Sequence, residues 1–226
     1  MPATPARIAC LHTAHSNISL FERAAAAAGR PLALRHEVRA DLLERAEHAG
    51  AMTPDLAAET ELALRALAGD ADAVLLNCST LGPAADAFAA SSTVPVLRAD
   101  AALAQRAVAQ GEGGTVVVLC TVQTTLVPTT RTFADAVAAS AWPDTSVDVR
   151  LIDGAWARFK AGDLPGYLAS IAEAADQAYD SGAHIVAFAQ ASMADAATRL
   201  HNGRGRIALD SPTAAIEALV AALAVR

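Results

Sequence analysis

The sequence is poor in aromatic residues and in charge. Aromatic side chains make up only 4% of the 226 residues, so the core must be built mainly from Ala, Val, Leu and Ile. Charged residues make up 18% and the formal net charge is -7, with the basic residues scattered along the chain. Proteins that bind nucleic acid gather basic residues into a patch or stripe, so nucleic acid is not an expected partner.

Long hydrophobic runs are also lacking. A membrane-spanning helix needs about 20 consecutive apolar residues, whereas Arg, Glu, Asp or Gln repeatedly interrupts the Ala-rich stretches of this chain. The N-terminus shows no basic region followed by an apolar segment and a small-residue cleavage site. We therefore expect a soluble, cytoplasmic protein with no membrane partner.

Cysteine is rare as well. Cys10, Cys78 and Cys120 are odd in number, far apart and without Cys-x-x-Cys spacing, which predicts neither a disulfide framework nor a zinc cluster. His12 and His15 could contact one ion, but two ligands do not make a site, so we expect no metal. The Gly-rich stretch 111–114 precedes a strand, whereas a dinucleotide-binding loop must follow one, so we expect no nicotinamide or flavin cofactor.

Short apolar runs alternate with helix-length stretches over nearly the whole chain, which is the pattern of an α/β protein with a mostly parallel sheet. We expect strands near 7–11, 32–36, 72–77, 94–98, 114–120, 147–152, 184–189 and 206–209. Helix starts are indicated at Ser16, at Thr53 with Pro54, at Asp100 and at Ser211 with Pro212.

The chain also repeats itself. Residues 7–16 resemble 115–124, and 71–80 resemble 183–192, in the same order and at similar spacing. This predicts a duplication: two pseudo-symmetric, Rossmann-like lobes, the first formed by 1–112 with 206–226 and the second by 113–205. Paired lobes usually face each other across a cleft, which the residues just after the strands would line.

Cys78 is the first candidate for chemistry. It follows an apolar run and precedes a helix start, where the amides of Ser79 and Thr80 could lower the pKa of the thiol and hold a carboxylate. Such a thiolate is a usable base or nucleophile. The alternative is a buried structural cysteine, since free Cys is among the most buried residue types.

The repeat identifies candidates in the second lobe. Gln190 stands opposite Cys78, and Ser192 opposite Thr80. A Gln amide cannot remove a proton from carbon, so the lobes are chemically unequal, and we expect Gln190 to contact the substrate unless it is polar filling at a strand end.

The loops after the first strands of the two lobes offer further candidates. His12, opposite Cys120, could be a general acid or base. Thr121, Thr124 and Thr125 could anchor an anion. The alternative is that these side chains only cap helices or bond backbone carbonyls.

The chain resembles the aspartate/glutamate/hydantoin racemase superfamily, which includes maleate isomerases and arylmalonate decarboxylases. The resemblance covers nearly the whole length and rests on NCST (77–80), VPVLRAD (94–100), GTVVVLCTVQTT (114–125) and LDSP (209–212). It implies two lobes, a cleft and cofactor-free chemistry beside a carboxylate. It also implies that Cys78 is the first catalytic thiol, that Ser79 and Thr80 bind the carboxylate, and that Thr121 with Thr124 or Thr125 binds an anion. Gln190 departs from the pattern, because many members carry a second cysteine there.

Three functions follow from this resemblance. The leading hypothesis is a cofactor-independent racemase or isomerase in which Cys78 acts at a carbon beside the carboxylate of a small acid or amino acid derivative, with His12 or Cys120 supplying any second proton transfer. The second is a lyase, in which Cys78 protonates a carbanion, or a covalent isomerase, in which it adds to an alkene or carbonyl. The third is a non-catalytic protein that binds small carboxylates. The family commonly forms dimers, so we expect a homo-oligomer.

Overall fold

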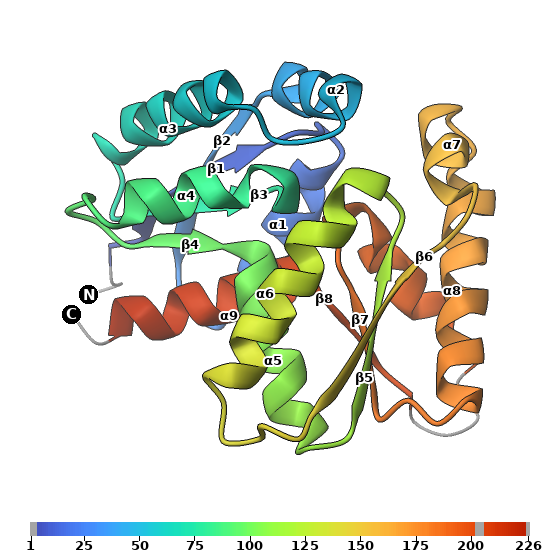
Figure 1. Ribbon diagram of the computed structural model, residues 1–226. Helices are drawn as coiled ribbons and strands as arrows, with labels where there is room; N and C mark the ends of the chain where they lie inside the picture. Colours follow the sequence, from blue (N-terminus) through green and yellow to red (C-terminus); the bar gives the residue numbers. More distant parts are fainter. Residues whose placement is uncertain (1–3, 202–205, 225–226) are drawn as a thin grey trace. The chain divides into compact units, whose positions relative to one another are not determined.

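The computed structural model describes residues 4–201 and 206–224, and the chain divides into two compact α/β units (Figure 1). The first unit contains the residues up to Ala102 together with those from Pro212 onward. The second unit is Leu103–Ser211. Each contains one four-stranded parallel sheet with the same strand order, as a duplication predicts.

The sheet of the first unit has the order β2-β1-β3-β4. Its strands are β1 (Ala6–His12), β2 (Leu32–Val38), β3 (Ala73–Asn77) and β4 (Val96–Arg98). The inner strand β3 is buried at every position, as expected for an apolar strand covered on both faces. The edge strand β2 alternates between partly buried and exposed residues in its first half and is partly buried from His36 to Val38. In the register of the sheet, His12 lies beside both Val38 and Asn77.

Five helices of the described residues are associated with this sheet. They are α1 (Asn17–Ala27), α2 (Ala40–Ala49), α3 (Pro54–Ala68), α4 (Gly82–Ala89) and, from the end of the chain, α9 (Ser211–Ala224). Thr53 caps α3 by accepting a hydrogen bond from the amide of Leu56, as the Thr-Pro signal predicts. The helix α3 packs against α4, β1 and β3, and its Leu64 is fully buried in the core.

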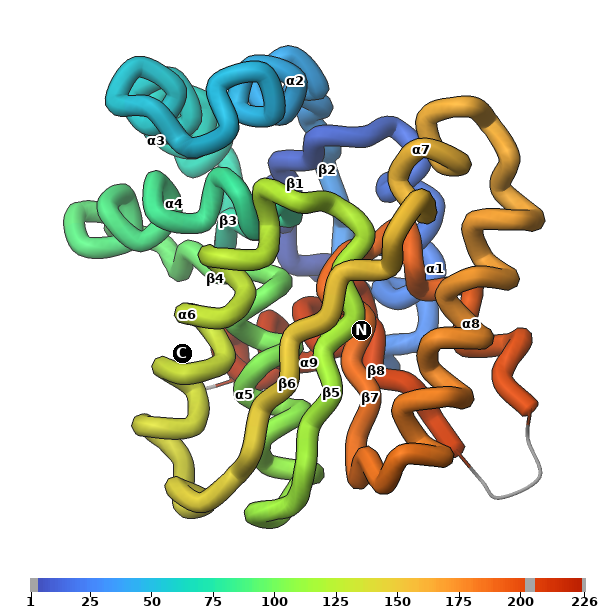
Figure 2. The backbone as a smooth tube through the Cα atoms, turned by 45° about the vertical axis from the view of Figure 1, so that its right-hand side comes forward, coloured from blue at the N-terminus to red at the C-terminus, as the bar shows by residue number. Residues whose placement is uncertain are grey.

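The second unit repeats this plan with the order β6-β5-β7-β8, and Figure 2 shows β6, β5 and β7 running side by side. Its strands are β5 (Thr115–Cys120), β6 (Ser146–Leu151), β7 (Ile185–Phe188) and β8 (Ala208–Asp210). Its helices are α5 (Ala99–Gly111), α6 (Leu126–Ala138), α7 (Ala155–Lys160) and α8 (Leu164–Asp180). The helix α8 packs against β5 and β7 and buries Tyr167 and Ile171 completely.

In each unit, the helix after the last strand belongs mainly to the other unit. The helix α5 follows β4, but most of its residues belong to the second unit, and α9 follows β8 but belongs to the first. The sequence assigned 1–112 and 206–226 to the first lobe, whereas in the structure β8 pairs with β7 in the second sheet. The reason is that β8 completes the second sheet as β4 completes the first, so that the chain changes units after the strand and not before it.

The predicted fold class is confirmed, since both sheets are parallel and helices flank them. Within the described residues, no helix combines the length and the apolar character needed to cross a bilayer.

Candidate functional site

Cys78 lies at the carboxyl end of β3, where the chain turns into α4. The fully buried strand ends at Asn77, Cys78 keeps an extended backbone with φ of -161°, and a single 3-10 turn, Ser79–Leu81, leads into the helix. The amide of Leu81 donates to the carbonyl of Cys78 at 3.2 Å, which closes the turn. Cys78 is half-buried, whereas Cys10 and Cys120 are fully buried.

The thiol of Cys78 is held in its neutral form by its surroundings. Although the residue is half-buried, desolvation raises the pKa of the Cys78 thiol, and the negative charge of Asp100 adds to the rise. Hydrogen bonds from the Thr13 hydroxyl and from the amides of Leu81 and Thr80 act in the opposite direction. The amides that the sequence predicted to lower the pKa are therefore present, but burial outweighs them. Because its pKa is raised, the Cys78 thiol keeps its proton at neutral pH.

A buried ion pair supports this turn. The guanidinium of Arg98, at the end of β4, donates to both carboxylate oxygens of Asp100 at 3.0 and 2.7 Å and to Asp86 at 2.5 Å. A Cβ on Gly82 would lie 2.6 Å from the same guanidinium, so the first residue of α4 must be a glycine for the arginine to keep this place. Two carboxylates thus fix Arg98 against the helix that begins just after Cys78.

His12 is fully buried at the end of β1, and both of its ring nitrogens have partners. Nδ1 lies 3.2 Å from the Asn77 amide nitrogen, and Nε2 lies 2.9 Å from Nδ1 of His36. The other ring nitrogen of His36 lies 3.0 Å from a carboxylate oxygen of Glu22. Burial, helped by His36, lowers the pKa of His12 to about 3. His12 is therefore a neutral, hydrogen-bonded side chain, and its predicted role as a general acid or base would require these bonds to break.

Cys10, His12 and His36 form a cluster that sequence reasoning missed. Their ligand atoms all lie within 4.8 Å of one another. Burial, with a smaller effect of Glu22, raises the pKa of Cys10 to about 12. His15, which the sequence offered as the partner of His12, is exposed and is not part of this cluster.

In the second unit, Gln190 joins the loops that follow β5 and β7. Its Oε1 accepts hydrogen bonds from the backbone amide of Thr121 at 2.7 Å and from the Thr121 hydroxyl at 3.1 Å. Its Nε2 donates to the Thr125 hydroxyl at 2.9 Å and also interacts with the Cys120 thiol. An amide has two acceptor sites and two N–H donors. All four are engaged within the unit, so Gln190 acts as a clamp between the two loops.

The network continues beyond Gln190. The Tyr167 hydroxyl lies 3.3 Å from the Thr121 hydroxyl and 2.8 Å from that of Ser192. Thr124 lies half-buried in the 3-10 turn between β5 and α6. Desolvation raises the pKa of the Cys120 thiol. The structure thus brings four of the five predicted residues of this unit into one hydrogen-bonded group, namely Thr121, Thr125, Gln190 and Ser192.

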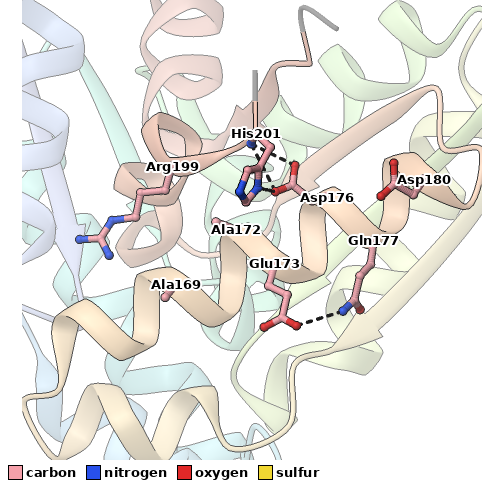
Figure 3. A pocket seen from close by; sticks show the side chains of 8 residues that line it. All are labelled: Ala169, Ala172, Glu173, Asp176, Gln177, Asp180, Arg199 and His201. Carbon is pink, nitrogen blue, oxygen red and sulfur yellow. Dashed lines mark hydrogen bonds and ion pairs between the residues drawn. The ribbon is translucent and has the colours of Figure 1, made fainter. Parts of the chain in front are cut away.

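A surface hollow of about 290 Å³ lies elsewhere in the second unit, along α8 (Figure 3). Glu173, Asp176, Gln177, Arg199 and His201 are among its lining residues, and His201 Nδ1 lies 2.6 Å from an oxygen of Asp176. None of the residues predicted from the sequence lines it.

Comparison with known proteins agrees with this architecture. The aspartate racemase of Picrophilus torridus has a similar structure, with a TM-score of 0.73 at 12% identity over 97% of this chain and 94% of that chain. An allantoin racemase of Pseudomonas fluorescens gives a TM-score of 0.66 at 16% identity, over 97% and 91% of the two chains. A glutamate racemase of Bacillus anthracis gives 0.69 at 11% identity, over 97% and 82%. These identities are low enough that the likeness shows the fold alone.

The sequence matches no curated protein. A family model, by contrast, matches residues 9–219, nearly the whole chain, and its description is Asp/Glu/Hydantoin racemase. The match includes both strand-end loops described above, with Cys78 in the first unit and Gln190 in the second. The protein therefore belongs to the Asp/Glu/Hydantoin racemase family.

Proposed function

We propose that this protein is a cofactor-independent enzyme of the racemase or isomerase type. In its thiolate form, Cys78 removes a proton from the carbon beside the carboxylate of a small acid or amino acid derivative, and the thiol so formed returns a proton to that carbon. Membership of the racemase family supports the reaction class. The position of Cys78 supports its role, because it is the half-buried cysteine of the three and lies at the carboxyl end of a parallel strand, where ligands bind in such sheets.

The turn around Cys78 suits a carboxylate next to the sulfur. Ser79 and Thr80 follow the thiol directly, and backbone amides at the start of a helical turn are donors that an anion can use. The amides of Thr80 and Leu81 bond to Cys78 in this structure, so they would turn to the carboxylate when it binds. A bound carboxylate would use these groups while leaving its neighbouring carbon near the sulfur. In this proposal Ser79 and Thr80 bind the substrate and Cys78 is the catalytic residue.

In the second unit, the proposal changes the role of Gln190 alone. The predicted substrate contacts there stay Thr121, Thr124, Thr125 and Ser192. The amide of Gln190 is hydrogen-bonded to Thr121 and Thr125, so we propose that Gln190 positions these threonines. The homodimer and the cytoplasmic location expected from the sequence stay predictions, and light scattering would measure the oligomeric state.

The test is isotope exchange in deuterated water. Single enantiomers of aspartate and glutamate, which structurally similar racemases have as substrates by name, are incubated with the protein and followed by NMR and chiral chromatography. Deuterium uptake with inversion supports proton transfer on both faces of the carbon, and uptake with retention supports one. Exchange should be lost in Cys78→Ser and kept in Cys120→Ser, because Cys120 is fully buried. If no acid exchanges with the wild-type protein, the proposed proton transfer is wrong.

A second function, a lyase, is favoured by two specific observations. Racemisation by two thiols needs a second sulfur, and Gln190 stands in its place with its amide engaged. Moreover, a raised pKa keeps Cys78 protonated, which suits the donation of a proton to a carbanion left by loss of carbon dioxide. The discriminating assay is release of carbon dioxide from disubstituted malonates, together with the chirality of the product. Release that persists in Cys78→Ala would remove the thiol from the mechanism.

A further inference from the structure

The buried cluster of Cys10, His12 and His36 lies between two neighbouring strands of the first sheet. Cys10 and His12 are two residues apart on β1 and so face the same side, and His36 on β2 pairs with Cys10 in the register of the sheet. Cys10 and His12 are fully buried, and the side chain of His36 is 11% exposed. The positions of these three side chains are thus set by the two strands and not by a mobile loop.

The residue types in this cluster are those that bind transition metals. A thiolate and two imidazoles form a ligand set that suits Zn²⁺, which takes Cys and His ligands in tetrahedral geometry. Sites of three protein ligands leave a fourth position for water or another small ligand. The ligand atoms are already within 4.8 Å of one another, so an ion needs only local adjustment of the side chains.

Each histidine has a polar side chain behind its ring, and for His36 it is the carboxylate that metal-binding histidines normally have. One nitrogen of His36 faces Cys10 and His12, while the other lies 3.0 Å from a Glu22 carboxylate oxygen. One nitrogen of His12 lies within the cluster, while the other lies 3.2 Å from the side-chain amide of Asn77. A carboxylate or carbonyl behind the imidazole fixes the orientation of the ring and raises its basicity as a ligand.

The fold itself does not require these polar side chains. The second unit has the same topology, and at the places equivalent to Cys10 and His36 in the paired inner and edge strands it carries Val118 and Val149. Burying imidazoles in a sheet core costs free energy unless their polar atoms are used. The first unit therefore carries two of the three cluster residues where its own duplicate carries valines, and the third, His12, stands opposite Cys120.

We propose that Cys10, His12 and His36 form a binding site for one transition-metal ion of the Zn²⁺ type. The site is distinct from the Cys78 turn and does not depend on the function proposed above. In the structure His12 Nε2 and His36 Nδ1 are 2.9 Å apart and share one proton in a hydrogen bond. Two nitrogens bound to one tetrahedral Zn²⁺ lie about 3.3 Å apart, given bonds of about 2.0–2.1 Å. The ion thus takes the place of the shared proton after a small separation of the rings.

The proton balance of this binding is defined. Cys10 gives up its thiol proton to solvent when its sulfur becomes a ligand. The proton on His12 Nε2 leaves that nitrogen and an equivalent proton is taken up at Nδ1, where rotation of the Asn77 amide supplies an accepting oxygen. His36 keeps its proton toward Glu22 and binds through its free lone pair. We expect one proton to be released for each ion bound.

The test is titration of the metal-free, full-length protein with Co²⁺ and Zn²⁺. Co²⁺ bound to a thiolate in tetrahedral geometry gives a sulfur-to-metal charge-transfer band and intense visible bands, and Zn²⁺ should displace it at one ion per chain. Calorimetry in buffers of different ionisation enthalpy measures the released proton. The absence of saturable one-to-one binding in the wild-type protein would overturn the proposal.

Three variants locate the site. Cys10→Ser should lose the charge-transfer band, whereas Cys120→Ser, which removes another fully buried thiol at a strand position of the second unit, should keep it. Cys78→Ser should also keep it, which excludes adventitious binding at the half-buried thiol. Glu22→Gln should weaken affinity by about 10- to 100-fold while retaining the band. Circular dichroism establishes that each variant is folded, and a band that survives in folded Cys10→Ser refutes the assignment.

Discussion

The clamp formed by Gln190 can be tested by Gln190→Leu, which replaces the amide by an apolar group of similar size. The substitution leaves no large cavity but removes every hydrogen bond of the side chain. The most costly loss is that of the hydrogen bond from the Thr121 backbone amide to Gln190 Oε1, which is 2.7 Å long. Thr121 is only 3% exposed, so water cannot readily replace the lost acceptor. The hydroxyls of Thr121 and Thr125 can rotate toward other acceptors, whereas a backbone N–H cannot.

The expected magnitude follows from these contacts. An unsatisfied buried donor costs about 1–3 kcal/mol. Thr121 and Thr125 keep hydrogen bonds to Tyr167 and to the Val122 carbonyl, so they add little. We expect the second unit to lose about 2 kcal/mol in its free energy of unfolding. Gln177→Leu is the matched control, because Gln177 is an exposed residue of the same unit, and its change should stay within about 0.5 kcal/mol.

The chain offers a reporter for this measurement. Both tryptophans, Trp142 and Trp156, lie in the second unit, so intrinsic fluorescence during urea unfolding follows that unit even where the two units unfold separately. If Gln190 instead only contacts substrate, Gln190→Leu would weaken ligand binding, and its unfolding midpoint would equal that of the control variant Gln177→Leu. A change below about 0.5 kcal/mol would therefore refute the clamp.

Two further predictions concern the Cys78 turn. Thr13→Val removes a hydroxyl that lowers the pKa of Cys78, so this pKa should rise further. The pH at which iodoacetamide labelling of Cys78 reaches half its maximal rate should then move upward. An unchanged midpoint would show that the hydroxyl does not stabilise the thiolate. Gly82→Ala places a Cβ against the Arg98 guanidinium, which its carboxylates prevent from moving away, and should cost about 1–3 kcal/mol in a thermal unfolding experiment. Gly69→Ala is the control in the same unit, because its Cβ would meet nothing closer than 3.6 Å and its φ of -59° suits alanine; equal losses in both variants would contradict the steric reasoning.

The fold was predictable because its signals are local or repeated. Apolar runs mark the inner strands β1, β3, β5 and β7, and the duplication gives the number of sheets and the equivalence of their loops. The assignment of residues to units was less predictable. Whether a helix packs on the sheet it follows or on the other unit depends on surfaces far apart in the sequence, and α5 and α9 both belong to the unit other than that of their preceding strand.

The candidate site was predictable in position but not in electrostatics. The apolar run before Cys78 and the Gly-Pro pair after it locate the strand end and the helix start. The direction of the pKa shift was not accessible, because amides near a thiol are visible in a sequence while the packing that desolvates it is not. Likewise, His36 is 24 residues from His12 and meets it only through the parallel register of β1 and β2.

The two units show how a duplicated fold acquires unequal chemistry. The sheets keep the same strand order, so the loops after β3 and β7 remain equivalent, and the side chains that begin them decide what each can do. Cys78 keeps its thiol half-buried, whereas Gln190 is bound by the threonines after β5. A Gln190→Cys substitution therefore would not simply restore a second thiol. It would also remove the clamp that orders Thr121 and Thr125, so any gain in two-sided proton transfer would depend on those threonines finding other partners.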